Sequence, residues 1–298
     1  MNKDDIIKQS IDQLAAPLGN LAPHFNDNGA ELPSVDALRQ IMLLLRGVIF
    51  PGFFSEAHAE NAVHRYLLGL NVNRINALLS SEILKAFMLV GTQSNDLEAL
   101  SAQTCTEFIA KLPAVRNVLL TDVQAMFDND PAATGKPEVI LCYPAVHALV
   151  HHRVAHTLLE LGVPLLPRII AEMAHSATGI DIHPGAKIGS YFSIDHGTGV
   201  VIGETCVIGD HVSIYQGVTL GAKNFSLDAN GHPINTPRHP IIEDYVTIYS
   251  NATVLGRITI GHNSIIGGNI WLTHSLPPNS RLLQRRPVEG PYINGAGI

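Results

Sequence analysis

The chain has 298 residues, of which 46% are hydrophobic and 15% charged, and its formal net charge is −7. This length allows two domains of ordinary size, and the negative charge argues against nucleic acid as a partner. No apolar run approaches the ~20 residues of a membrane span, and the first residues lack the apolar core of a signal peptide. Three scattered cysteines favour a reducing compartment over a disulfide framework. We therefore expect a cytoplasmic protein that binds neither membranes nor nucleic acids.

Residues 1–178 predict an all-helical domain, because apolar residues recur there at helical spacing. Ser34 is expected to cap one helix, and prolines are expected to end others at Pro113 and Pro144, since proline removes a helical hydrogen bond. Residues 71–73 are expected to interrupt another helix, and residues 127–137 form a turn-rich connection. The predicted helices are residues 1–14, 35–49, 58–88, 107–127, 138–162 and 164–176.

From residue 180 onward, aliphatic residues recur every six positions instead of every three or four. The main series is Ile182, Ile188, Ile194, Ile202, Ile208, Ile214 and Leu220, with two extra residues between Ile194 and Ile202. A second series lies two positions earlier and comprises Ile180, Ala186, Phe192, Val200, Cys206, Val212 and Val218. After a polar stretch, the same phase resumes at Ile242, Ile248, Val254, Ile260, Ile266 and Leu272.

A sustained period of six is typical of a hexapeptide β-helix, in which three hexads make about one turn. We therefore predict an α+β protein, with an N-terminal all-helical domain followed by a left-handed parallel β-helix. The helical domain spans residues 1–178, the β-helix spans 179–276 and a tail spans 277–298. Residues 222–240 are expected to form a loop extruded from the coil, and long loops on rigid scaffolds are usually functional.

Four short motifs and the chain end carry a family resemblance. They are D-I-H-P at 181–184, D-H-G-T-G at 195–199, V-S-I-Y-Q-G-V-T-L-G at 212–221, R-H-P at 238–240 and the terminal Gly297-Ile298. In this order, after a helical front half, they resemble the serine O-acetyltransferases. The resemblance implies transfer of acetyl from acetyl-CoA to L-serine, which gives O-acetylserine for cysteine biosynthesis. It also implies trimers built through the β-helix, with two trimers paired through helical domains in many members.

The implied reaction needs a base, because an alcohol is a poor nucleophile near neutral pH. His196 is the candidate, by resemblance and by its place beside a hexad corner. Asp181 would accept the other ring N–H of His196 and stabilise the imidazolium, by the logic of the Ser-His-Asp triad. The two residues are fifteen positions apart, so they would approach across neighbouring coils.

Serine has to be held at its carboxylate and at its ammonium group. The forked guanidinium of Arg238 suits the carboxylate, and Asp195 suits the ammonium. The resemblance adds Asp130 as a second acid and His239 as a contact to substrate or to the developing oxyanion. It also places His147 near the serine pocket.

Acetyl-CoA is expected as a co-substrate, with no tightly bound cofactor, in a groove between coils of adjacent subunits. The candidate contacts are Gly221, Ala222, Lys223 and Ser250. At residues 249–252 and 267–271 the chain departs from the glycine- and alanine-rich segments of many members.

Four histidines in one predicted helix, His147, His151, His152 and His156, lack the neighbouring Glu or Cys of a metal-ligand pattern, so we expect no metal site. At the chain end, the resemblance implies that Ile298 enters the active site of O-acetylserine sulfhydrylase, a form of carboxylate capture.

Three other interpretations remain open. One is a hexapeptide-repeat acetyltransferase that uses another small alcohol or amine. Another is a zinc-dependent lyase on the same fold, with His196, His211 and His239 as ligands. The third is a non-catalytic scaffold that binds a partner through the tail.

Overall fold

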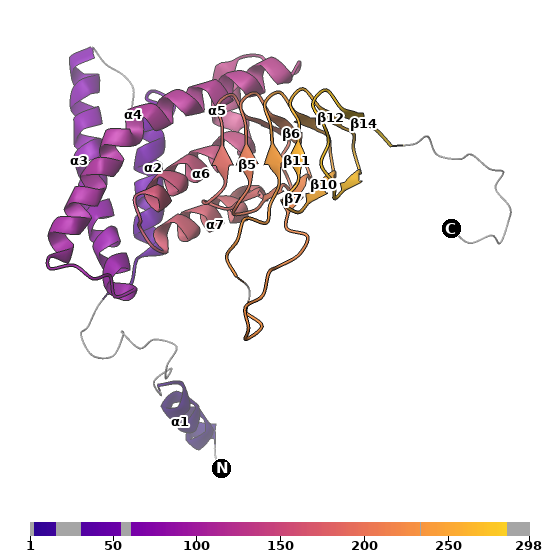
Figure 1. Cartoon of the computed structure of the whole chain (residues 1–298). Helices are drawn as coiled ribbons and strands as arrows, with labels where there is room; N and C mark the ends of the chain where they lie inside the picture. Colours follow the sequence, from indigo (N-terminus) through magenta and orange to yellow (C-terminus); the bar gives the residue numbers. More distant parts are fainter. Residues whose placement is uncertain (1–2, 16–30, 55–60, 233, 285–298) are drawn as a thin grey trace.

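The structure, a computed structural model, describes residues 3–15, 31–54, 61–232 and 234–284. Helices occupy the first part of the chain and short parallel strands the second (Figure 1). The helices are α1 (Lys3–Leu14), α2 (Val35–Ile49), α3 (Asn61–Leu89), α4 (Leu97–Asn129), α5 (Lys136–Cys142), α6 (Pro144–Glu160) and α7 (Leu166–Thr178). None of the helices in these ranges is both long and apolar enough to cross a membrane.

The helix limits confirm two of the predictions about helix ends and correct two others. Ser34 caps α2 by accepting a hydrogen bond from the N–H of Ala37 (3.2 Å), and the chain breaks between α5 and α6 just before Pro144. Residues 71–73 do not interrupt α3. Pro113 does not bound a helix either, because α4 runs through it and begins ten residues earlier than predicted. Buried side chains on both sides of Pro113, from Phe108 to Leu119, hold the helix against the lost hydrogen bond.

The strands wind into a three-sided parallel coil. The first face contains β1 (Asp181–Ile182), β4 (Val201–Ile202), β7 (Thr219–Gly221), β10 (Thr253–Leu255) and β13 (Trp271–Leu272). The second contains β2 (Lys187–Ile188), β5 (Val207–Ile208), β8 (Ile241–Ile242) and β11 (Thr259–Ile260). The third contains β3 (Ser193–Asp195), β6 (Ser213–Tyr215), β9 (Thr247–Ile248), β12 (Ile265–Ile266) and β14 (Arg281–Leu282). The sequence placed the end of this coil at Leu276, but β14 pairs with β12 beyond Pro277-Pro278, so the coil is longer than predicted.

Both six-residue series of aliphatic side chains point into the coil, as the hexad pattern predicts. Ile194, Ile202, Ile214 and Leu220 are at most 1% exposed, and the second series, from Ile180 to Val218, is equally buried. Stacking these residues along the axis forms one continuous apolar core, because each coil covers the core residues of the coil before it.

Three columns of turns separate the faces. The His196 corner lies between the third and first faces and comprises residues 196–200, 216–218, 249–252 and 267–270. The loop corner lies between the first and second faces and comprises residues 183–186, 203–206, 222–240 and 256–258. The extruded loop projects from this second column between β7 and β8, as predicted (Figure 1). The remaining column, between the second and third faces, carries Tyr191 and His211.

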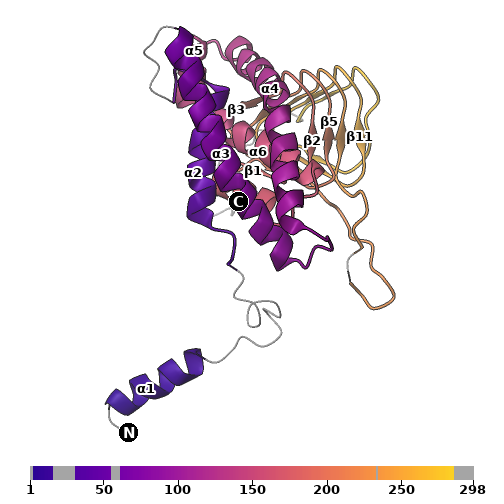
Figure 2. The same ribbon diagram turned by 90° about the vertical axis from the view of Figure 1, so that its left-hand side faces the viewer.

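The helical domain covers the N-terminal end of the β-helix, where β1 and β3 lie (Figure 2). Helices α4 and α6 contact β3, and α7 contacts β1. A buried ion pair fastens this junction: Arg153 of α6 binds the carboxylate of Asp122 in α4 (3.1 Å) and donates to the carbonyl of Gly189 in the first coil (2.7 Å). Asp122 in turn accepts a hydrogen bond from the backbone N–H of Phe192 (3.1 Å). The pair therefore ties two helices to the β-helix.

Candidate active site

A small pocket lies where the end of α4 meets the third face of the coil. Residues from α4, the α5–α6 connection, β3 and β6 line it: Met126, Asn129, Asp130, Tyr143, Ser193, Ile194, Asp195, Ser213, Ile214 and Tyr215. The side-chain amide of Asn129 donates to the hydroxyls of Ser193 (2.9 Å) and Ser213 (3.0 Å), which fixes the helix end against both strands. The pocket therefore brings Asp130 and Asp195 together although they are 65 positions apart.

Asp130 is held as a charged carboxylate at this pocket. The hydroxyl of Tyr143 donates to one of its oxygens, and the N–H of Ala132 donates to the other (2.8 Å). These bonds lower the pKa of Asp130, with a smaller contribution from the charge of His196. The same bond raises the pKa of the Tyr143 hydroxyl. Asp130 is thus an anion with its position set by two donors.

Asp195 lies beside Tyr215, because β3 and β6 are paired in register at these residues. Asp195 is half-buried and its strand neighbour Ile194 points into the core, as alternation along a strand requires. The pocket therefore presents two acids and two phenols, from Asp130, Asp195, Tyr143 and Tyr215.

His196 begins the turn that follows Asp195. Its backbone has φ 56°, in the left-handed region, and its side chain is 74% exposed. The imidazole Nε2 lies 4.0 Å from Oδ1 of Asp195. Gly197 and Gly199 follow, also at positive φ, and accommodate the two extra residues predicted between Ile194 and Ile202. The insertion therefore turns an imidazole outward beside the two acids.

Asp181 lies one coil away from His196 at the same corner. Its residue neighbour Ile180 packs directly under Gly197, where an added Cβ would lie 2.5 Å from the Ile180 side chain. Asp181 is half-buried on the first face, in register with Val201. Within the described residues, Asp181 makes no hydrogen bond or ion pair with His196, whose imidazole lies toward Asp195 instead.

Arg238 and His239 occupy the loop corner, away from His196 on the cross-section of the coil. The Arg238 guanidinium binds the carboxylate of Glu204 (2.6 Å). Thr205 holds both residues, because its hydroxyl accepts the backbone N–H groups of Arg238 (2.9 Å) and His239 (3.1 Å). Burial would raise the pKa of Glu204, but the bonds from Arg238 and Asn235 outweigh burial and keep it below its ordinary value.

His239 is a buried, neutral histidine. Burial, followed by the charge of Arg238, lowers its pKa to about 4. The N–H of Thr205 donates to its Nδ1 (3.1 Å), so the ring proton resides on Nε2. The ring lies against Gly203, where any Cβ would overlap it. His239 therefore presents an N–H donor at the loop corner.

The expected acetyl-CoA contacts fall on two corners. Gly221 ends β7, and Ala222 and Lys223 start the extruded loop at the loop corner, whereas Ser250 lies at the His196 corner. Both segments that depart from the family pattern, 249–252 and 267–271, run along the His196 corner into β13, two and three coils beyond His196. One chain therefore does not bring the four expected contacts together.

The helical-domain histidines lie outside the Asp130 pocket. His147 and His151 line a cavity among α2, α6 and α7, and His147 also lines a smaller cavity with Tyr143, so its expected place near the serine pocket stays a prediction. His156 contacts the first coil through the carbonyl of Pro184 (2.7 Å). No cluster of three metal-ligating side chains occurs within the described ranges, and His196, His211 and His239 lie on three different corners.

Sequence reasoning missed four residues that build these sites: Tyr143, Tyr215, Glu204 and Thr205. Tyr215 was accessible from the hexad phase, because it follows Ile214 as Asp195 follows Ile194. No sequence pattern points to Tyr143, Glu204 or Thr205, since the residues that they bind lie far away in the sequence.

Comparisons with known proteins agree with this arrangement. No protein-family model matches the chain. The plasmid-encoded serine acetyltransferase of Synechococcus elongatus is 46% identical over 286 residues, which is 93% of this chain and 90% of that protein. The Entamoeba histolytica serine acetyltransferase isoform 3, solved with cysteine, has a TM-score of 0.72 and 31% identity over 97% of this chain and 94% of its own. The Brucella abortus serine acetyltransferase, solved with coenzyme A, has a TM-score of 0.56 and 28% identity over 85% and 96%.

Identity at this level over nearly the full length of both chains, together with the shared helical domain and β-helix, establishes the family that the motifs indicated. The chain belongs to the serine acetyltransferases.

Proposed function

We propose that this chain transfers the acetyl group of acetyl-CoA to the hydroxyl of L-serine in one displacement, with His196 as the general base. Family membership supports the reaction, and the Brucella abortus relative was solved with coenzyme A. The observation that carries the mechanism is the gathering of Asp130, Asp195 and the exposed imidazole of His196 at one corner.

In this mechanism His196 removes the proton of the serine hydroxyl as its oxygen attacks the thioester carbon. A C–O bond forms, the C–S bond breaks, and the electron pair leaves with the CoA sulfur. His196 then returns the proton to that sulfur, so the products are O-acetylserine and free CoA. A positioned base of this kind contributes roughly 10²–10⁴-fold to the rate.

Asp181 is proposed as the positioning residue for His196. Packing of Ile180 under Gly197 supports this role, because it keeps Asp181 and the His196 turn on adjacent coils of one corner. Rotation of the imidazole away from Asp195 would allow it to donate to Asp181. Asp181→Asn should lower kcat and move the acid limb of its pH profile to lower pH, because the His196 imidazolium loses a stabilising carboxylate, with little change in the KM for serine.

The serine substrate is proposed to bind through both of its charged groups. Asp130 and Asp195 are placed to hold the ammonium, and Arg238 has the fork that suits a carboxylate. The Nε2–H of His239 can donate to the oxyanion that develops on the thioester carbonyl. Because Arg238 and His239 lie at a different corner from His196, we propose that a neighbouring copy in a trimer supplies them.

A mixing experiment tests this shared site. His196→Asn and Arg238→Ala are each expected to be nearly inactive. Co-assembled from equal amounts, they should recover about one quarter of wild-type activity, the share of neighbouring pairs that carry both intact residues in a randomly mixed ring. Sites contained within single chains would recover nothing.

A steady-state assay with L-serine and acetyl-CoA tests the reaction itself. Free CoA should be released with serine and not with a panel of other small alcohols and amines. A wild-type enzyme that prefers another acceptor would support the alternative acetyltransferase. Stoichiometric zinc, with activity lost to chelators, would support the lyase.

Three further predictions extend beyond the site. We propose that the helical domains pair two trimers, which sedimentation can measure. Capture of Ile298 by O-acetylserine sulfhydrylase concerns residues 285–298, which lie outside the described ranges, and it stays a prediction together with the cytoplasmic location.

A further inference from the structure

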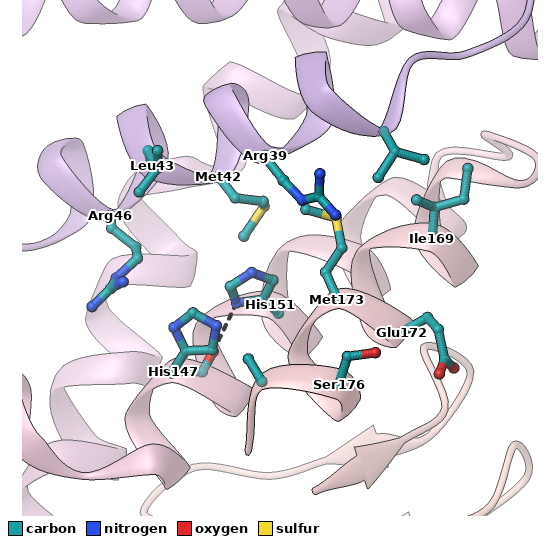
Figure 3. A pocket seen from close by; sticks show the side chains of 12 residues that line it. Arg39, Met42, Leu43, Arg46, His147, His151, Ile169, Glu172, Met173 and Ser176 are labelled. Carbon is teal, nitrogen blue, oxygen red and sulfur yellow. Dashed lines mark hydrogen bonds between the residues drawn. The ribbon is translucent and has the colours of Figure 1, made fainter. Parts of the chain in front are cut away.

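A cavity of about 630 Å³ lies in the helical domain among α2, α6 and α7, apart from the Asp130 pocket (Figure 3). Its volume is within the range of sites that bind small organic ligands. Most of the wall is apolar and is formed by Val35, Met42, Leu43, Ile169, Met173 and Ala177. The proposed acetyl transfer uses none of these residues.

One cation in this cavity has no anionic partner among the residues that the structure describes. The guanidinium of Arg46 lies over the ring of Phe54, with its central carbon 4.0 Å from the ring centroid. In the described part of the chain Arg46 makes no ion pair, and its partial burial lowers its pKa. A half-buried guanidinium beside an aromatic ring, without a carboxylate, is well suited to bind an acidic group.

The other charged groups of the cavity are already paired at its rim. Arg39 is bound to Asp36 at 2.5 Å, and Glu172 lies 3.3 Å from His175. Figure 3 shows Arg46 and His147 at one end of the cavity and Glu172 toward the other. The single carboxylate of the lining therefore does not compensate Arg46.

The two histidines beside Arg46 do not add charge. The Nδ1–H of His151 donates to the carbonyl of His147 (2.8 Å), and the two rings lie 4.2 Å apart. Burial lowers the pKa of both residues, to about 4 for His151, so both are neutral near pH 7. Among the described residues that line this end of the cavity, the positive charge therefore belongs to Arg46.

We propose that this cavity binds an organic anion with an apolar body, its acidic group on the guanidinium of Arg46 and its body between Met42 and Met173. Charge and shape support this class together. A small inorganic anion would leave the apolar wall uncovered, and a neutral apolar molecule would leave the charge of Arg46 without a partner. This site goes beyond the proposed acetyl transfer, since neither Arg46 nor the apolar wall has a role in that reaction.

The test uses a matched pair of fluorescent probes on the full chain. 8-Anilinonaphthalene-1-sulfonate carries the acidic group, and N-phenyl-1-naphthylamine has the same ring system without it. Titrations are made with saturating CoA, so that the CoA groove is occupied. The wild type should bind the sulfonate, and Arg46→Met should weaken that binding about tenfold or more, as expected for a lost charge-assisted hydrogen bond.

Three comparisons make the result specific. Arg46→Lys should retain most of the affinity for the sulfonate, because the charge is kept. Arg39→Met, which removes a cation already paired at the rim, should leave it nearly unchanged. Arg46→Met should bind the neutral probe as the wild type does. The proposal is overturned if the wild type does not bind the sulfonate, if Arg46→Met binds it as well as the wild type, or if the neutral probe is lost equally.

Discussion

The phenol of Tyr143, the residue between α5 and α6, donates a hydrogen bond to the carboxylate of Asp130, the residue that follows α4. The N–H of Ala132 donates to the other oxygen at 2.8 Å. Two donors leave Asp130 ionised and aligned, with lone pairs free on the pocket side. This relationship matters because the proposed ligand of Asp130 is an ammonium group, whose binding depends on a fixed negative charge.

Replacing Tyr143 by Phe removes this donor and keeps the ring. We expect kcat/KM for serine to fall about tenfold, since a hydrogen bond to a charged group contributes roughly 1.5–3 kcal/mol. The KM for acetyl-CoA should not change. Tyr66→Phe is the matched control, because Tyr66 is an exposed tyrosine of the same domain. Equal effects on both substrates would contradict a specific role in serine binding.

His196→Asn tests the proposed base. Asparagine tolerates the left-handed backbone of this turn, so the fold should be kept. The turnover should fall about 10²-fold or more. His211→Asn is the control, because His211 has the same backbone region, φ 57°, at another corner. A zinc lyase would need both histidines, so loss of activity in both variants would count against the acetyltransferase mechanism.

Asp122→Asn should destabilise the junction between helices and coil. It leaves the guanidinium of Arg153 buried without its counter-charge, and losing one partner of a buried pair costs about 3–5 kcal/mol. Urea denaturation at fixed protein concentration measures the change. Asp36→Asn removes the partner of Arg39 in an exposed pair and should cost less than about 1 kcal/mol. Similar values for the two variants would refute the anchoring role.

Gly203→Ala should displace the imidazole of His239 while leaving the histidine itself unchanged. An added Cβ would overlap the imidazole that Thr205 holds in place, and overpacking of this kind costs about 1–3 kcal/mol. We expect reduced stability and at least a roughly tenfold lower kcat/KM, as for a displaced oxyanion donor. Gly69→Ala is the control, because nothing lies within 4 Å of its Cβ position in α3. Full activity in Gly203→Ala would remove His239 from the mechanism.

Stability should fall as the pH falls from about 6.5 to about 4. Burial lowers the pKa of His151 to about 4 in the folded chain, against about 6.5 when unfolded. The unfolded state therefore binds more protons in this window, and the contribution of about 3 kcal/mol, complete above pH 6.5, is lost on acidification. His151→Gln should flatten this acid limb in urea denaturations, whereas His232→Gln, in the exposed loop, should leave it as it is. If the stability of His151→Gln falls with pH as steeply as that of the wild type, other groups cause the loss of stability.

Much of the fold was accessible from the sequence. The period of six from Ile180 to Leu272 predicted the coil and its two inward series, because residues at equivalent positions of successive repeats stack on one another. The insertion after Ile194 predicted a special turn, and it carries His196. Proline was the weaker guide: Pro144 marks a break, but packing around Pro113 keeps α4 continuous.

The site could be predicted only in part, because sequence motifs identify candidate residues but do not give their positions in space. Asp130 and Asp195, both candidates for the serine ammonium, line one pocket, and their binding role stays a prediction. Tyr143 could not be foreseen as a partner of Asp130, since that contact depends on how α5 leaves the end of α4. His147 lines the helical-domain cavity and a smaller one that also includes Tyr143, so its expected place near the serine pocket stays a prediction.

The amino-acid pattern alone predicted a helical domain and a hexad coil, since these follow from short-range periodicity, and the family resemblance supplied the candidate reactive side chains. Only the tertiary structure shows at which corner of the three-sided coil each of those side chains lies. His196 lies on one edge of the prism and Arg238 on another, because the number of hexads between them sets the rotation about the axis. Residues that act together in the proposed reaction are therefore separated within one chain, and the proposed trimer would unite them between neighbouring copies.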